Sequence, residues 1–207
     1  MIVSLNEAEV MATKAAWGAG RPWGLAQEAG RAVSALESLR LPGARSLLDL
    51  LVATDRVPCE KMRPASVHSE CWQAGHPMCP VLVGAFIADM GMQSEEVNLR
   101  RVHAPLLLVS FCQTSSDKAV VSWDDCSIHT SDDGVSVRGV MNAPIADRVL
   151  IARCEPAGDT THHWHPGAVD IADEIWEALS AFAHRTYVPA TEASRLKGAG
   201  AGLTDND

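Results

Sequence analysis

Apolar residues recur every three or four positions in the first quarter of the chain and again near its end, whereas the middle alternates or runs apolar in short stretches. The first pattern predicts amphipathic helices and the second predicts strands. Their order along the chain predicts an α+β fold. In it an N-terminal helical cluster packs on a mostly antiparallel sheet, and a long C-terminal helix packs on the same sheet.

Start and stop signals indicate where the helices lie. Ser4 and Glu7 have the spacing of a capping box, and glycines soon afterwards end the first helix. Pro22 and Pro42 suit the first turns of the next two helices, because proline is favoured there. The expected helices are 5–17, 23–39, one that opens at 42, and a last one over 168–183.

Strands are expected in the middle of the chain. Short apolar runs at 81–87 and 104–111 are typical of buried strands. Asp133 and Gly134 separate two alternating segments, which is a strong hairpin signal. Residues 57–80 show no period and predict an irregular connection. The remaining expected strands are 119–123, 127–130, 135–138 and 148–153.

The length of 207 residues predicts one domain. A chain of this size buries enough surface to fold without a disulfide or a structural metal. The domain is expected to contain a helical part (1–55), a sheet part (80–155), the C-terminal helix (167–185) and a Gly-rich tail (190–207).

The charge balance narrows the range of partners. A formal net charge of −9 offers no basic face for nucleic acid or for an anionic membrane. A small anionic ligand stays open, because two or three local cations suffice to bind it. No secretory signal and no spanning apolar run is present, so we expect a cytoplasmic protein with six reduced cysteines.

The densest group of reactive side chains is the stretch 162–166, HHWHP. In an extended chain, side chains two residues apart point the same way, and the following proline favours that geometry at His165. His163 and His165 can then share a divalent transition metal, which suits neutral imidazole. The competing interpretation is a polar loop that leads into the last helix. The candidate third ligands are Glu155, Asp159 and His184.

Two glycine-rich stretches, 18–24 and 198–202, add further candidates. The first lies directly before a helix, where free amides bind anions and Arg21 adds positive charge. A tight helix–helix corner is the alternative. The second follows Arg195 and Lys197, and it either frays as a tail or folds back over a site. Arg21, Arg195 and Lys197 are therefore the candidate ligand-binding residues.

Two Cys/His pairs lie close in the sequence: His68 with Cys71, and Cys126 with His129. A nucleophilic thiol needs a base within hydrogen-bonding reach. Residues three apart share a face of a helix, which suits the first pair, but face opposite sides of a strand, which excludes the second. Free cysteines more often simply pack in the core.

The stretches SLNEAEVMATKAAWGAGRPWGLAQEAG (4–30) and SRLKGAGAGLTDND (194–207) resemble the two ends of a bacterial family known only as a domain of unknown function. The resemblance extends over nearly the full chain, with the middle less distinctive. It implies a stand-alone bacterial protein of about this length, to which the C-terminal glycine run belongs. It implies no catalytic residues.

Two classes of function follow. The first is a small-molecule metabolic enzyme with a site near 162–165, to which Arg21 contributes. The alternative is a non-catalytic accessory subunit or ligand-binding module that supports a partner enzyme. The lack of a complete catalytic signature favours the second, whereas the clustered histidines and glycine-rich stretches favour the first, which is our working hypothesis. A small molecule or a partner protein is the expected partner, and a homodimer stays open.

Overall fold

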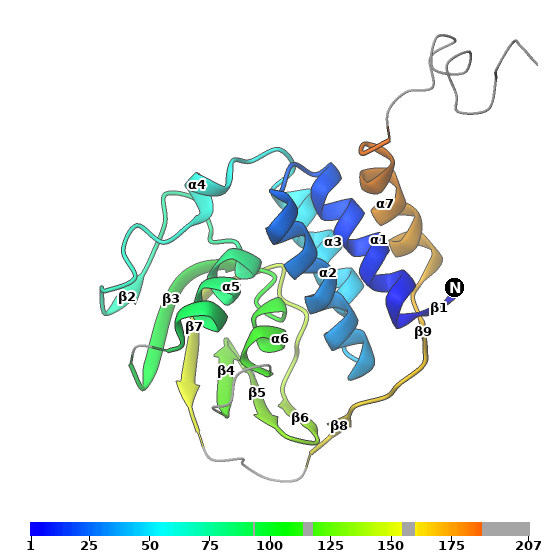
Figure 1. The fold of residues 1–207 in the computed structure, drawn as a ribbon. Helices are drawn as coiled ribbons and strands as arrows, with labels where there is room; N and C mark the ends of the chain where they lie inside the picture. Colours follow the sequence, from blue (N-terminus) through cyan, green and yellow to red (C-terminus); the bar gives the residue numbers. More distant parts are fainter. Residues whose placement is uncertain (93, 114–117, 155–159, 188–207) are drawn as a thin grey trace, which may run out of the picture.

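The computed structural model describes all residues except 93, 114–117, 155–159 and 188–207 (Figure 1). A layer of helices lies beside a seven-stranded sheet, and buried residues from both layers join in one hydrophobic core. The α+β fold predicted from the sequence is therefore confirmed. The C-terminal helix (Asp173–His184), however, packs mainly against the first and third helices and not on the sheet as predicted. None of the helices in the described part of the chain is both long and apolar enough to cross a membrane.

Four helices form the helical layer. Ser4 caps the first of them, because its hydroxyl accepts a hydrogen bond from the Glu7 amide while the Glu7 carboxylate accepts one from the Ser4 amide. Pro22 precedes the second helix. The three N-terminal helices therefore begin and end close to the predicted residues. The four are α1 (Leu5–Gly18), α2 (Trp23–Ser38), α3 (Gly43–Ala53) and α7 (Asp173–His184).

The N-terminus is joined to the segment that precedes α7. β1 (Ile2–Ser4) pairs antiparallel with β9 (Ala168–Asp170), and the Met1 amino group donates to the Asp170 carboxylate and the Ile171 carbonyl. The helix predicted from residue 168 begins instead at Asp173, because residues 168–170 form this strand.

The main sheet has the strand order β2-β3-β7-β4-β5-β6-β8. Every neighbouring pair is antiparallel except β2 with β3. β5 and β6 form the hairpin predicted at Asp133 and Gly134. The strands are β2 (Cys71–Trp72), β3 (Glu96–His103), β4 (Ala119–Trp123), β5 (Cys126–Ser131), β6 (Gly134–Arg138), β7 (Ile145–Arg153) and β8 (His162–His163).

Two helices, α5 (Pro80–Met90) and α6 (Leu107–Gln113), cover one face of this sheet (Figure 1). The strands predicted at 81–87 and 104–111 are therefore wrong. A short continuous apolar run fits a buried helix as well as a buried strand. Nearly every residue of α6 is buried, so no polar face reveals its helical period. A proline at the first position of α5 is the signal that favoured a helix.

A single helical turn, α4 (Cys59–Met62), lies within the stretch that was predicted to be irregular. Beyond it the chain reaches the sheet edge through β2, which has only two residues. Met78 then forms an isolated parallel bridge with Val102 of β3. The connection is thus irregular as predicted, but it also supplies one edge of the sheet.

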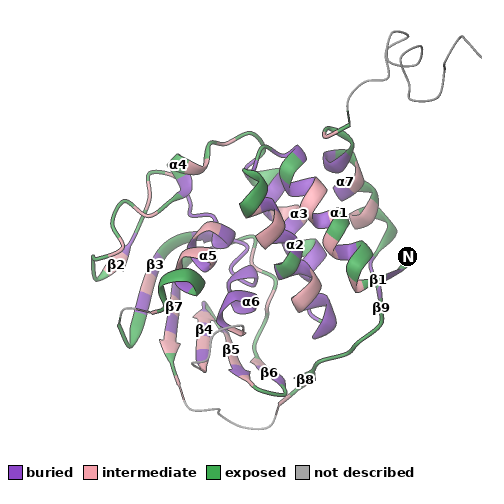
Figure 2. Cartoon of the chain, in the orientation of Figure 1, coloured by how far each residue is buried: buried purple, intermediate pink, exposed green. Residues whose placement is uncertain are grey.

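Alternate residues of the central strands face opposite sides of the sheet (Figure 2). On β3, Val97 and Leu99 are buried towards α5 and α6, whereas Asn98 and Arg100 remain accessible. The same alternation runs along β4, β5 and the second half of β7. We call the two sides the covered face and the open face.

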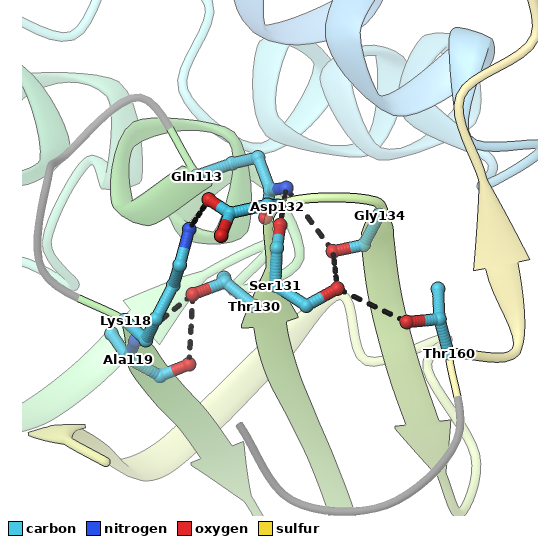
Figure 3. A network of polar contacts seen from close by, with 8 residues as sticks. All are labelled: Gln113, Lys118, Ala119, Thr130, Ser131, Asp132, Gly134 and Thr160. Carbon is cyan, nitrogen blue, oxygen red and sulfur yellow. Dashed lines mark hydrogen bonds and ion pairs between the residues drawn. The ribbon is translucent and has the colours of Figure 1, made fainter. Parts of the chain in front are cut away.

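A network of polar contacts joins α6 to the β5–β6 hairpin (Figure 3). The Gln113 side-chain amide donates to the carbonyls of Ser131 and Gly134, at 2.7 and 3.1 Å. Lys118 and Asp132 form an ion pair beside it. Because Gln113 donates only to backbone carbonyls here, the network holds α6 to the hairpin.

Candidate functional site

A groove of about 1320 Å³ crosses the open face of the sheet. Its floor is formed by β3, β7 and the end of β4, and residues 67–73, which include β2, form one wall. Typical small-molecule pockets have volumes of roughly 300–1,000 Å³. The groove is large enough for a ligand that lies along the strands.

The strand register determines which side chains form the floor. Arg100 of β3 is directly opposite Arg148 of β7, and we call these two residues the arginine pair. Directly opposite side chains point to the same face, with Cβ atoms about 4.5–5.5 Å apart. In the next row Asn98 is opposite Leu150, which is opposite Ser122 of β4. The floor therefore carries two guanidinium groups beside an amide, an apolar side chain and a hydroxyl.

The strand alternation is interrupted next to the arginine pair. Arg101 has a φ of 53°, in the left-handed region that residues other than glycine seldom adopt. A regular strand would turn Arg101 and Asp147 towards the covered face, yet both are exposed. Val102 resumes the buried pattern. The interruption keeps a third arginine in solvent at this end of the groove.

Carboxylates also line the groove, but none of those that the structure describes forms an ion pair with Arg100 or Arg148. Glu70, Glu96, Asp124 and Asp147 are the acidic residues of the lining. In the part of the chain that the structure describes, no carboxylate forms an ion pair with either member of the arginine pair. Arginines elsewhere do form such pairs: Arg31 with Glu28, Arg45 with Asp49, and Arg185 with Asp55.

The wall of the groove contains the first predicted Cys/His pair. His68 and Cys71 both line the groove, but the segment is not helical. Ser69 shapes a turn there, because its hydroxyl contacts the carbonyls of Ser66 and Cys71. Within the described residues no hydrogen bond joins His68 to Cys71, so this thiol lacks the adjacent base that a nucleophile needs.

A different Cys/His pair lies further along the open face. Cys126 and His129 face opposite sides of β5, as predicted, with Cys126 buried. His129 Nδ1 instead lies 3.8 Å from Sγ of Cys154. Burial, with a smaller contribution from Arg138, lowers the pKa of His129, which favours the neutral ring. The sequence could not indicate this contact, because it depends on β4 lying between β5 and β7.

The thiols buried in the core are unreactive. Among the described residues, which include all six cysteines, no disulfide is formed. Burial raises the pKa of Cys112 to about 12 and that of Cys126 to about 11, and it also raises the pKa of Cys79. Since the thiolate is the nucleophile, these three cysteines pack and do not react.

The His-rich segment lies between the end of α2 and the edge of the sheet, where His163 pairs with Gly134 of β6. His162 Nδ1 is 3.1 Å from the carbonyl of residue 39, and the His165 amide donates to that of residue 38 at 2.8 Å. No group of three His, Cys, Asp or Glu side chains that could hold a metal exists among the described residues. Glu155 lies outside those residues. The metal site formed by His163, His165 and Glu155 stays a prediction.

Arg21 lies in the core, with only 4% of its surface exposed. Its guanidinium donates to the carbonyls of Thr54 and Val57 at 3.0 Å each, so it joins the α1–α2 connection to the end of α3. Arg21 precedes α2, whereas the His-rich segment contacts its other end. The 16 residues of α2 span about 24 Å, so the structure does not bring the two together. Arg195 and Lys197 lie outside the described residues.

Sequence comparison relates one part of the chain to a known family. No curated protein and no solved structure matches the chain. The model of a family described as "Protein of unknown function (DUF3726)" matches residues 3–79. These residues cover α1 to β2 and end before α5, so they include the groove wall but not the arginine pair. The resemblance of segment 4–30 to a family of unknown function is confirmed, and the chain is similar to that family over α1, α2, α3 and the connection that ends at residue 79.

Proposed function

We propose that this chain is a non-catalytic ligand-binding module whose site is the groove on the open face of the sheet. The observation that carries this proposal is the groove itself, which has a polar floor and a volume of about 1320 Å³. Ligand sites are concave and place a few polar groups to orient what they bind. The arginine pair, Asn98 and Ser122 are such groups, presented by rigid strands.

An enzyme with a site near 162–165 has less support and stays a prediction. His162 and His165 hold their segment against α2, and Arg21 is used in the core. Among the described residues that line the groove, no thiol or hydroxyl has a hydrogen-bonded base. A binding role needs neither group, which is why it fits the geometry better.

A thermal-shift screen of the full chain tests the proposal. The panel contains organic acids, sugar phosphates, nucleotides, amino acids and amines. A ligand at a hundred times its Kd stabilises the folded protein by about 2.7 kcal/mol, which a melting curve resolves easily. We expect at least one class to raise the Tm of the wild type.

Two tryptophan variants show whether such a ligand lies in the groove. Ser122→Trp places an indole on its floor, and Glu174→Trp places one at an exposed position of α7, outside the lining. We expect Ser122→Trp to lose the Tm shift and Glu174→Trp to keep it. The proposal fails if no class shifts the wild type, or if both variants respond alike.

The setting of the module also remains to be tested. We propose a bacterial, cytoplasmic protein, acting on its own or as a homodimer beside a partner enzyme.

A zinc titration of untagged protein tests the metal prediction separately. His163→Ala, His165→Ala protein should bind less zinc than the wild type, and equal uptake by both would remove the metal site.

A further inference from the structure

The arginine pair is held in place by the sheet. β3 and β7 are antiparallel, and seven residue pairs fix their register from Glu96 to His103. Leu99 and Val149, the neighbours of the two arginines, are buried on the covered face. Since alternate residues of a strand face opposite sides, both guanidinium groups must lie on the open face. The positions of the two charges are therefore set by the fold.

Two arginines that face each other on the sheet destabilise the fold unless a negative charge offsets their repulsion. Like charges directly opposite each other on a sheet are destabilising. The chain has 26 acidic residues against 17 basic ones, so carboxylates are plentiful. Even so, four of them line the groove without forming an ion pair with these arginines, within the residues that the structure describes. A bound anion would remove the repulsion.

We infer that the arginine pair is an anion site, which binds the carboxylate or phosphate group of a small ligand in the groove; the inference rests on the function proposed above. Guanidinium groups are planar forks that match the oxygens of either group with paired hydrogen bonds. Leu150 lies two residues beyond Arg148 on the same face and offers apolar contact to the body of the ligand.

The rest of the groove restricts the ligand to a small anion. Glu70, Glu96, Asp124 and Asp147 line the same groove as the arginine pair. A nucleic acid or another long polyanion needs cations spread along its whole path, and these carboxylates would repel it. A single anionic group can bind the two arginines without approaching these carboxylates.

Isothermal titration calorimetry of the full chain at low ionic strength tests the inference, with inorganic phosphate and succinate as probes. We expect saturable binding of at least one probe, and the tighter of the two identifies the preferred anion. Arg100→Gln and Arg148→Gln should each weaken it roughly tenfold to a hundredfold, because each removes charge-assisted hydrogen bonds. Arg148→Lys should lie between, since lysine keeps the charge but loses the fork.

Arg31→Gln is the matched control, because it removes the same charge from α2, away from the groove, and should leave binding unchanged. In addition, the Arg100→Gln, Arg148→Gln double variant should not melt below the wild type at low salt, and phosphate or succinate should no longer raise its Tm. Failure of both probes to bind the wild type, or equal binding by the double variant, overturns the inference. A groove ligand that is lost in Ser122→Trp but kept in the double variant would overturn it and leave the proposed function intact.

Discussion

On β3, Leu99 is 1% exposed on the covered face, and the next residue, Arg100, is exposed on the open face. β7 makes the same change between Val149 and Arg148. The covered face is mostly apolar and carries α5 and α6 (Figure 1), whereas the open face includes amides, hydroxyls and charges. Neighbouring residues of one strand thus experience opposite environments.

The covered face therefore stabilises the fold, whereas the side chains of the open face are available for a function. An antiparallel sheet with one solvated face ordinarily mixes polar residues of both signs on that face. The covered face is mostly apolar, as expected for the side of a sheet that packs on helices. On the open face two arginines stand opposite each other, although charges of opposite sign are expected there. The arginine pair is informative because packing does not require it.

The largest effect is expected from a matched pair of alanine variants at adjacent positions. Leu99→Ala removes a buried side chain and leaves a cavity, which should lower the free energy of unfolding by about 2–5 kcal/mol. Arg100→Ala changes an exposed position and should stay within about 0.5 kcal/mol of the wild type. Urea denaturation measures both. A large loss in Arg100→Ala would show that the open face is structural and would break the comparison.

A smaller loss is expected where α5 approaches α6 above the covered face. A Cβ added at Gly84 would lie 2.3 Å from the ring of Phe111, which is itself buried. Gly84→Ala should therefore overpack the core and cost about 1–3 kcal/mol.

Gly24→Ala is the control for that variant. Position 24 lies in α2 and has no atom within 4 Å of an added Cβ. Alanine should stabilise it by about 0.5–1 kcal/mol, because a helix favours alanine over glycine. If Gly84→Ala melted no lower than the wild type, the layer above the sheet would be more loosely packed than the structure shows.

A pH effect of intermediate size should come from His103, at the buried end of β3. Burial, with smaller contributions from His76, Arg101 and Arg21, lowers the pKa of His103. The unfolded chain, with a pKa near 6.5, then binds a proton more readily than the folded one. The stabilisation is complete above about pH 6.5 and is lost as the pH falls towards the folded-state pKa.

His103→Gln should flatten that part of the stability curve measured by urea denaturation between neutral and mildly acidic pH. The seven other histidines are the same in both proteins, so the difference between the two curves isolates this ring. Parallel curves would contradict the lowered pKa.

How far the sequence predicts this fold depends on whether each helix has a polar side. α1, α2 and α3 have solvent-facing residues between their buried ones. Their helical period therefore shows in the sequence, and the predicted positions lie close to the observed ones. α5 and α6 are almost wholly apolar and were mistaken for strands. β3 was missed, although Val97 and Leu99 alternate with polar neighbours, because Arg100 and Arg101 break the alternation halfway.

The candidate site was less predictable than the fold, because it depends on strand register. Arg148 was inside a predicted strand, but nothing in the sequence indicated that it would face Arg100. The histidines at 163 and 165 were conspicuous because they cluster in the sequence. Local clustering singles out His163, which pairs with β6, and His165, whose amide contacts α2, whereas the arginine pair arises from segments that meet only in the folded sheet.

The smallest effect is expected from the ion pair between Lys118 and Asp132 beside the hairpin (Figure 3). The Asp132 side chain is 89% exposed and that of Lys118 is 22% exposed. Exposed pairs of this kind contribute about 0–1 kcal/mol, because water screens the attraction and ordering two side chains costs entropy. Asp132→Asn should therefore change the free energy of unfolding by less than about 1 kcal/mol, and the change should shrink further in high salt. Urea denaturation at two ionic strengths measures both. A salt-independent loss larger than this would mean that the Lys118–Asp132 pair stabilises the junction of the hairpin with α6 (Figure 3), so that not every exposed charge pair of the sheet is dispensable for the fold.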